Sequence, residues 1–312
     1  TIREQVRMAV ASGKPYNVIT CNDSDSDPGP GVMNYLPIGS SVLPEYPELK
    51  LYCPPFLDML AYTYENEFTH IHAATPGPVG LAGMGVARIL GLPISSTYHT
   101  AFPQYALHLT EDPHMEEVMW RFMVWFYNQM DTVYVPSMAV GRELESHGIE
   151  PEKITFYPRG VDTERFTPSK RNGFYKNYEL NGNLKLLYVG RVSKEKNLHI
   201  LEKAFDILAR RHPNIDMVVV GDGPYRKEMA QHIEGSNCLF TGMLQGEDLT
   251  AAYASSDLFI FPSTTDTFGK VVLEAQASGL PAIVTDMGGP QENIIDGETG
   301  RIVQGEDPVA LA

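Results

Sequence analysis

Two carboxylates flank a predicted anion-binding loop in the stretch PSTTDTFGKVVLEAQASGLP, which runs from Pro262 to Pro281. An apolar run at residues 257–261 predicts a strand before this loop, and Phe268-Gly269 opens a predicted helix after it. The free N–H groups at a helix start, together with the positive end of the helix dipole, favour a phosphate or another anion. Asp266 and Glu274 stand on either side of that helix start.

Each of these acids also has an ordinary structural interpretation. Asp266 could cap the helix, and Glu274 could be a solvated residue on its surface. Gly279 and Pro281 mark the predicted end of the helix, because glycine suits a left-handed C-terminal position and proline cannot continue the helix. The loop before Gly269 is therefore expected at a helix N-terminus, beyond the carboxyl end of a strand.

Two basic side chains follow a second predicted strand, Leu184 to Val189. The sequence there reads GRVSKEKN from Gly190 to Asn197, and it places Arg191 and Lys196 beside a tight glycine turn. Both are candidate anion ligands, although basic loop residues are often simply solvated. The Gly-x-Gly-x-x-Gly fingerprint of dinucleotide-binding proteins does not follow this strand, which argues against a nicotinamide-dependent dehydrogenase.

A histidine follows a predicted strand in the first half of the chain. Residues 93–97 predict this strand, and His99 comes directly after it in the run Tyr98 to Tyr105, YHTAFPQY. Ligands of open α/β sheets bind beyond the carboxyl ends of the strands. This position favours a functional role for His99 over a structural one.

Two other patterns that could suggest a metal site are better explained without one. His70 and His72 share one face of a predicted strand at residues 69–73, but no third ligand follows at a suitable spacing. The aspartates of NDSDSDPGP, residues 22–30, lie among prolines and glycine and read as a solvated loop. We assign no metal.

Helices and strands alternate on both sides of a polar, irregular segment at residues 159–183. Such alternation predicts two α/β domains, each a doubly wound parallel sheet. We expect an N-terminal domain over residues 1–165 and a C-terminal domain over residues 166–312. A helix rich in methionine and aromatic residues, Glu116 to Met130, includes Trp120 and Trp125 and is expected to pack in the core rather than touch a membrane, because it lacks a basic polar face.

Several of these motifs, in this order, resemble those of the retaining glycosyltransferases of family 4, which have the GT-B fold. The stretch from Pro262 matches the donor-binding motif of that family, except that its first acid is usually Glu and here is Asp266. The run from Tyr98 to Tyr105 resembles the active-site loop of its lipid- and mannose-directed members. Further similar segments are the hinge at residues 159–166, the diphosphate-binding segment at 190–197, and the turns at 221–224 and 240–242.

The resemblance implies two Rossmann-like domains facing across a cleft and transfer of a hexose from a UDP- or GDP-sugar to a lipid, glycan or small-molecule acceptor. It implies retention at the anomeric carbon, no cofactor and no obligatory metal. The implied catalytic residues are His99, Arg191, Lys196 and Asp266. The implied donor-binding residues are Gly190, Gly221, Gly223, Met243, Thr267, Phe268, Gly269 and Glu274.

Two alternatives stay open. One is a GT-B epimerase or phosphorylase, for which we find neither acid/base carboxylates suited to sugar-ring chemistry nor a pyridoxal lysine. The other is a sugar-nucleotide-binding module without catalysis, because we expect the strand and glycine-rich loop that open the acceptor side in this family to be missing from this chain. We expect a truncated end after Asp307 as well.

The amino-acid composition excludes some classes of binding partner. The 312 residues carry 24 Lys+Arg against 39 Asp+Glu, a formal charge of -15, which disfavours nucleic acid and allows at most peripheral membrane contact. The three cysteines, Cys21, Cys53 and Cys238, are widely spaced, which indicates a reducing compartment. Neither a signal peptide nor a long apolar run is present, so we expect a cytoplasmic protein.

Overall fold

The computed structural model describes residues 6, 9–13, 15–24, 28–43, 46–157, 159–178, 180, 184–233 and 237–312. The chain forms two compact units. The first comprises residues 1–99, 109–134 and 144–155, and the second comprises residues 100–108, 135–143 and 156–312. The helical spacing of Ile2, Val6 and Val10 predicts a helix over residues 1–11, which lies mostly outside the described residues.

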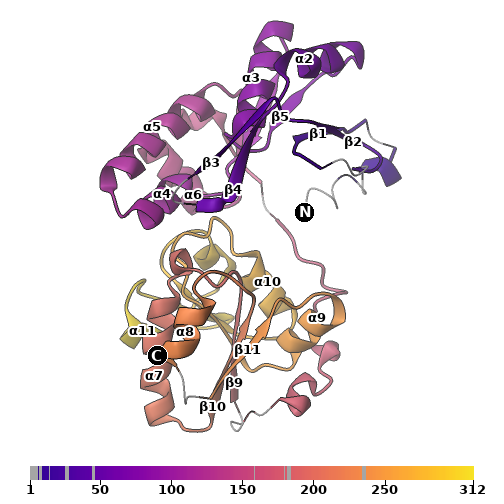
Figure 1. Ribbon diagram of the computed structural model, residues 1–312. Helices are drawn as coiled ribbons and strands as arrows, with labels where there is room; N and C mark the ends of the chain where they lie inside the picture. The colour runs from indigo at the N-terminus through magenta and orange to yellow at the C-terminus, as the bar shows by residue number, and fades with distance from the viewer. Residues whose placement is uncertain are drawn as a thin grey trace. The chain divides into compact units, whose positions relative to one another are not determined.

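A four-stranded sheet organises the first unit. Its order is β5-β6-β7-β8, and the pairs β5/β6 and β6/β7 are parallel. The helices α2 and α3 lie side by side, and α3 packs on β5 (Figure 1). The bounds are Phe56–Glu65 for α2, Ile71–Ala73 for β5, Pro78–Leu90 for α3, Ile94–Thr97 for β6, Phe102–Thr110 for α4, Pro113–Asn128 for α5, Thr132–Val135 for β7, Met138–Ser146 for α6 and Ile154–Phe156 for β8.

Before α2 the chain adds two small sheets, in a region where the sequence pattern predicts only one strand, at residues 16–20. β1 (Val18–Cys21) pairs in parallel with β2 (Val32–Tyr35), and β3 (Gly39–Leu43) forms an antiparallel hairpin with β4 (Tyr46–Cys53). The pattern gave no clear strand signal because β1, β2 and β3 are only four or five residues long, and the apolar Val42 on β3 is exposed.

The helix α5 packs mostly as expected. Met123, Phe126 and Met130 are buried, and Trp120 stacks face to face on His147 with ring centroids 3.5 Å apart. The expectation was wrong for Trp125, which is 48% exposed because it lies on the opposite side of the helix. Among the described residues, no helix combines the length and the apolar character that crossing a bilayer requires.

The second unit is built on a six-stranded, wholly parallel sheet in the order β11-β10-β9-β12-β13-β14. The chain enters at β9, builds outward through β10 and β11, then returns to the other side of β9 and continues outward through β12. The strand order therefore reverses between β9 and β12. The bounds are Leu184–Val189 for β9, Ile215–Val220 for β10, Cys238–Gly242 for β11, Leu258–Phe261 for β12, Ala282–Thr285 for β13 and Gly300–Val303 for β14.

Helices cover both faces of this sheet. Figure 1 shows α7, α8 and α11 on one side, and α9 and α10 on the other. Every residue of β10 is buried, as expected for a parallel strand covered on both faces. The bounds are Leu198–Arg211 for α7, Arg226–His232 for α8, Gly246–Ala254 for α9, Lys270–Ala277 for α10 and Pro308–Leu311 for α11.

The close approach of two loops in this unit makes a glycine substitution a sharp test of the fold. Gly221 has a φ of +140°, and a Cβ there would lie 1.8 Å from the carbonyl oxygen of Gly190. Gly221→Ala should therefore destabilise the second unit by about 2–4 kcal/mol, measured by chemical denaturation. Gly246→Ala is the matched control, since its φ is +57° and the added Cβ meets open space. Equal losses in the two variants would contradict the loop packing described here.

Candidate functional site

The reversal of strand order creates the site. The helices that follow β9 and β12, α7 and α10, lie on opposite faces of the sheet, and ligands of such sheets bind beyond the carboxyl ends of the two strands between which the order reverses. The loop after β9 carries Arg191 and Lys196, and the loop after β12 carries Asp266. The two charged groups predicted from distant parts of the sequence thus belong to adjacent loops.

An ion pair joins these loops. Lys196 Nζ lies 2.8 Å from Asp266 Oδ2, and the side chains are only 12% and 25% exposed. Burial by itself lowers the pKa of Lys196, but the attraction of Asp266 and other neighbouring groups outweighs it, so the pKa is raised above its ordinary value. Lys196 is therefore a fixed cation at neutral pH.

Uncharged hydrogen bonds hold the same two loops together. Asn197 Nδ2 donates to Thr264 Oγ1 at 2.8 Å, and Thr265 Oγ1 donates to the carbonyl oxygen of Glu195 at 3.0 Å. Asn197 has a φ of +53°, a left-handed conformation that asparagine tolerates better than most residues. These contacts position Lys196 and Asp266 independently of their own pairing.

Close packing of the loops after β9 and β10 accounts for the predicted glycines Gly190, Gly221 and Gly223. A Cβ on Gly223 would lie 2.3 Å from the carbonyl oxygen of Val192, and Val192 N donates to the carbonyl oxygen of Asp222 at 3.0 Å. The carbonyl oxygen of Arg191 accepts a hydrogen bond from the Tyr188 hydroxyl at 2.9 Å. This turn fixes the backbone from which the Arg191 side chain extends.

The helix start at Phe268-Gly269 has the expected geometry. Gly269 has a φ of +75°, and no side chain caps the first turn of α10. Thr267 and Phe268 are buried. A further loop, not predicted from the sequence, supports them: Gly289 N donates to the carbonyl oxygen of Asp266 at 2.9 Å, and a Cβ on Gly289 would lie 2.0 Å from the carbonyl oxygen of Thr267. The signal available for it was the run Gly-Gly-Pro directly after β13.

Glu274 is held separately, on α10. It is buried, it accepts a hydrogen bond from the Tyr253 hydroxyl at 3.1 Å, and Lys270 Nζ lies 3.8 Å from its second oxygen. Burial raises the pKa of Glu274, with Lys270 and Tyr253 acting in the opposite direction. Tyr253 lies on α9 and was not predicted, because no local pattern links it to Glu274.

The remaining predicted positions have diverse surroundings. His99 is exposed directly after β6 in the first unit, and Met243 is 71% exposed directly after β11. Their roles stay predictions. His70 Nε2 and His72 Nδ1 both share hydrogen bonds with Ser95 Oγ, at 2.7 and 2.9 Å, which gives these rings a structural role in the strand pair.

Comparisons with known proteins place this chain in a family. Residues 1–165 match the model of "Glycosyltransferase Family 4", and residues 171–312 match that of "Glycosyl transferases group 1". The chain belongs to this glycosyltransferase family. The resemblance stated from the motifs is thereby confirmed.

Curated relatives agree with this assignment. The sulfoquinovosyl transferase SQD2 of Arabidopsis thaliana is 34% identical over 235 residues, 74% of this chain and 45% of that protein. A GDP-mannose-dependent alpha-mannosyltransferase of Corynebacterium glutamicum is 34% identical over 75% of this chain and 54% of its own length. The corresponding protein of Mycobacterium tuberculosis is 32% identical over 85% and 68%. The chain spans about half the length of the first two relatives.

Solved structures confirm the predicted GT-B fold with its two Rossmann-like domains. HepE of Anabaena, solved with UDP and glucose, superposes with a TM-score of 0.72 over 95% of this chain and 88% of that one, at 20% identity. Sucrose-phosphate synthase of Thermosynechococcus elongatus gives a TM-score of 0.76 over 99% and 81%, at 21% identity. At such identities the likeness establishes the fold alone.

The environment of Glu274 predicts an unusual pH dependence of stability. Its pKa is raised in the folded state, so the folded chain binds this proton more tightly than the unfolded chain, and stability falls as pH rises from the ordinary value of 4.5 through the raised one. Glu274→Gln should therefore raise the melting temperature at pH 7, and the advantage should shrink as pH falls toward 4.5.

The control is Glu298→Gln, because Glu298 is exposed on the loop before β14. Melting is followed by differential scanning calorimetry between pH 4.5 and 8. A Glu274→Gln variant that is less stable than the parent at pH 7 would show that the bonds to Tyr253 and Lys270 outweigh the burial of charge.

Proposed function

We propose that this chain is the catalytic part of a retaining glycosyltransferase that transfers a hexose from a UDP- or GDP-sugar to a lipid, glycan or small-molecule acceptor. The main support is the Lys196–Asp266 pair at the point where the sheet order reverses. The names of the relatives add to it, since two of them use GDP-mannose and others are an "Alpha-monoglucosyldiacylglycerol synthase" and a "D-inositol 3-phosphate glycosyltransferase".

The pair suits a sugar diphosphate because each partner keeps unused capacity. An ammonium group has three N–H donors; Asp266 Oδ2 takes one of those of Lys196, and the Tyr105 side chain is a second hydrogen-bond partner. A remaining donor can reach a phosphate oxygen, with Arg191 as a second cation from the same loop. The other carboxylate oxygen of Asp266 can accept a hydrogen bond from a sugar hydroxyl.

The proposed reaction breaks the bond between the anomeric carbon and the diphosphate oxygen, and the electron pair stays on the diphosphate. The acceptor oxygen bonds to the anomeric carbon on the same face, and its proton passes to the departing phosphate. Negative charge grows on the diphosphate in the transition state, where Lys196, Arg191 and the N–H groups that open α10 stabilise it. In this mechanism we assign no obligatory metal and no dedicated protein base.

The nucleoside would be held farther along the same loops. We assign the ribose hydroxyls to Glu274, whose ionised oxygens are acceptors only, and the base to the turn at residues 240–243 that ends with Met243. The glycines at 190, 221 and 223 let the backbone turn tightly beside the ligand. His99, from the other domain, is assigned to the transferred sugar.

We place the reaction in the cytoplasm. Cys21, Cys53 and Cys238 are free thiols, as expected in a reducing compartment. The acidic net charge favours a membrane contact that is peripheral at most, even if the acceptor is a lipid.

Replacing the cation of the pair tests the donor site directly. Lys196→Ala should weaken binding of UDP or GDP by about 10- to 100-fold, because a charge-assisted hydrogen bond contributes about 1.5–3 kcal/mol. Arg191→Lys should also be costly, since an ammonium does not reproduce the guanidinium fork. Isothermal titration with both nucleotides measures these losses and identifies the base.

Lys194→Ala is the matched control, because Lys194 is two residues away, is exposed and pairs with Glu228 at 3.4 Å. Unchanged affinity in Lys196→Ala, with native melting, would remove the diphosphate from this crevice. A chain that binds a nucleotide but neither transfers nor hydrolyses any UDP- or GDP-hexose would instead be a binding module.

The assignment of His99 predicts a split between turnover and nucleotide affinity. His99→Ala should lower kcat/KM for the nucleotide-sugar by about tenfold or more and leave the affinity for the bare nucleotide unchanged, because the nucleotide carries no sugar to contact. His114→Ala, at the exposed start of α5, is the control. Equal losses in both measurements would assign His99 to the phosphates or to the fold.

A further inference from the structure

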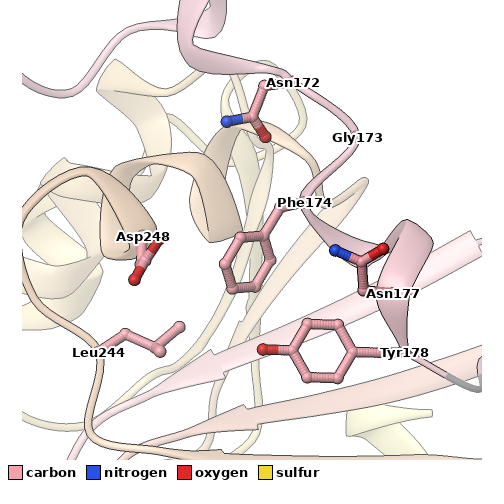
Figure 2. Close-up of a pocket in the computed structure, with 7 residues that line it drawn as sticks. All are labelled: Asn172, Gly173, Phe174, Asn177, Tyr178, Leu244 and Asp248. Carbon is pink, nitrogen blue, oxygen red and sulfur yellow. The ribbon is translucent and has the colours of Figure 1, made fainter.

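A pocket of about 410 Å³ opens on the second unit, and it is lined by none of the residues assigned to the donor. It lies where the segment at residues 172–178 meets the loop after β11 and the first turn of α9 (Figure 2). Its lining residues are Asn172, Gly173, Phe174, Asn177, Tyr178, Leu244 and Asp248.

Aromatic rings form the apolar part of this pocket. The rings of Phe174 and Tyr178 lie with centroids 5.6 Å apart at an angle of 39°, and both pack at their inner edges against the core of the second unit. Figure 2 shows the Phe174 ring between Asp248 and Asn177, with the Tyr178 hydroxyl directed toward Leu244. A half-buried aromatic pair with a hydroxyl at one end offers an apolar face and a polar group side by side.

The polar lining is selective in charge. Among the described residues that line it are a carboxylate, Asp248, and two amides, Asn172 and Asn177, but no basic residue. A phosphate or carboxylate ligand would meet Asp248 without a compensating cation, which is unfavourable. Neutral hydroxyl groups of a ligand suit this lining, because they can donate hydrogen bonds to the carboxylate and can both donate to and accept from the amides.

The pocket is preformed, because its two walls are tied together. The Tyr175 hydroxyl donates to the carbonyl oxygen of Ala252 at 3.0 Å and lies 2.9 Å from Ser256 Oγ, and all three residues are buried. These contacts join the segment before β9 to the C-terminal end of α9. A rigid pocket binds a small ligand with little ordering cost, and this volume lies within the range of small-molecule sites.

We propose that this pocket is a second carbohydrate-binding site, which holds one uncharged hexose unit of a glycan or glycolipid against Phe174 and Tyr178. The C–H face of a pyranose ring would stack on the aromatic side chains, and its hydroxyls would bond Asp248 and the two asparagines. The site is independent of the donor chemistry proposed above, since it uses different residues and needs no nucleotide.

The test titrates the ¹⁵N-labelled chain with methyl α-glucoside, methyl α-mannoside and maltose, and follows the side-chain amide signals of Asn172 and Asn177. At least one sugar should shift these signals saturably, with a Kd of about 1 mM as expected for a few hydrogen bonds and one stacked ring. Asp248→Ala should weaken that binding roughly fivefold or more. Glu247→Ala is the matched control, because it removes the adjacent carboxylate, which pairs with Lys170 outside the pocket.

Phe174→Leu keeps an apolar side chain against the core but removes the aromatic face, and it should also weaken the sugar. Lys196→Ala should leave sugar binding unchanged, which separates this site from the donor crevice whether or not the donor proposal holds. The proposal is overturned if no sugar shifts the asparagine signals, if Asp248→Ala and Glu247→Ala act alike, or if uridine or inorganic phosphate shifts the signals as strongly as the sugars.

Discussion

The half-buried ion pair between Lys196 and Asp266 is the interaction on which the candidate site of the second unit depends. Bringing an ammonium and a carboxylate out of water costs free energy that their attraction offsets only in good geometry. The bonds of Asn197 and Thr265 already fasten the same two loops without charge. The charges are therefore not needed to hold the loops together, which supports a ligand as the reason for their presence.

The sheet makes this pair possible. Residues 70 positions apart meet because β9 and β12 are neighbours in a parallel sheet whose order reverses between them. Glycines on the adjoining loops let the chain pass within contact distance of Gly190 and Thr267, where any side chain would collide with a carbonyl oxygen. Backbone packing and charge placement are thus two consequences of one topology.

Local and global electrostatics have opposite signs in this protein. The chain carries a formal charge of -15, yet Lys196, whose pKa is raised, is held as a cation beside Asp266. Surface charges are screened beyond about 10 Å at ordinary ionic strength, so an anionic ligand responds mainly to the groups that line its site. The helix α9 contributes to two different sites. Its Tyr253 hydroxyl donates to Glu274, and its Asp248 lines the pocket beside Phe174 and Tyr178.

The sequence by itself determined the elements that are buried and continuous, and the loops that follow them. The strand Leu184–Val189 was predicted at its observed bounds, because its last four residues form the apolar, buried run that a parallel strand covered on both faces requires. The family could also be identified from the sequence, because its motifs are short contiguous segments in those loops. Only the tertiary structure decided which loops meet, because strand order is not encoded in any local pattern. It alone paired Lys196 with Asp266, set Tyr253 on Glu274, placed Gly289 beneath Thr267, exposed Trp125 and assembled a pocket from segments that the sequence holds about 70 residues apart.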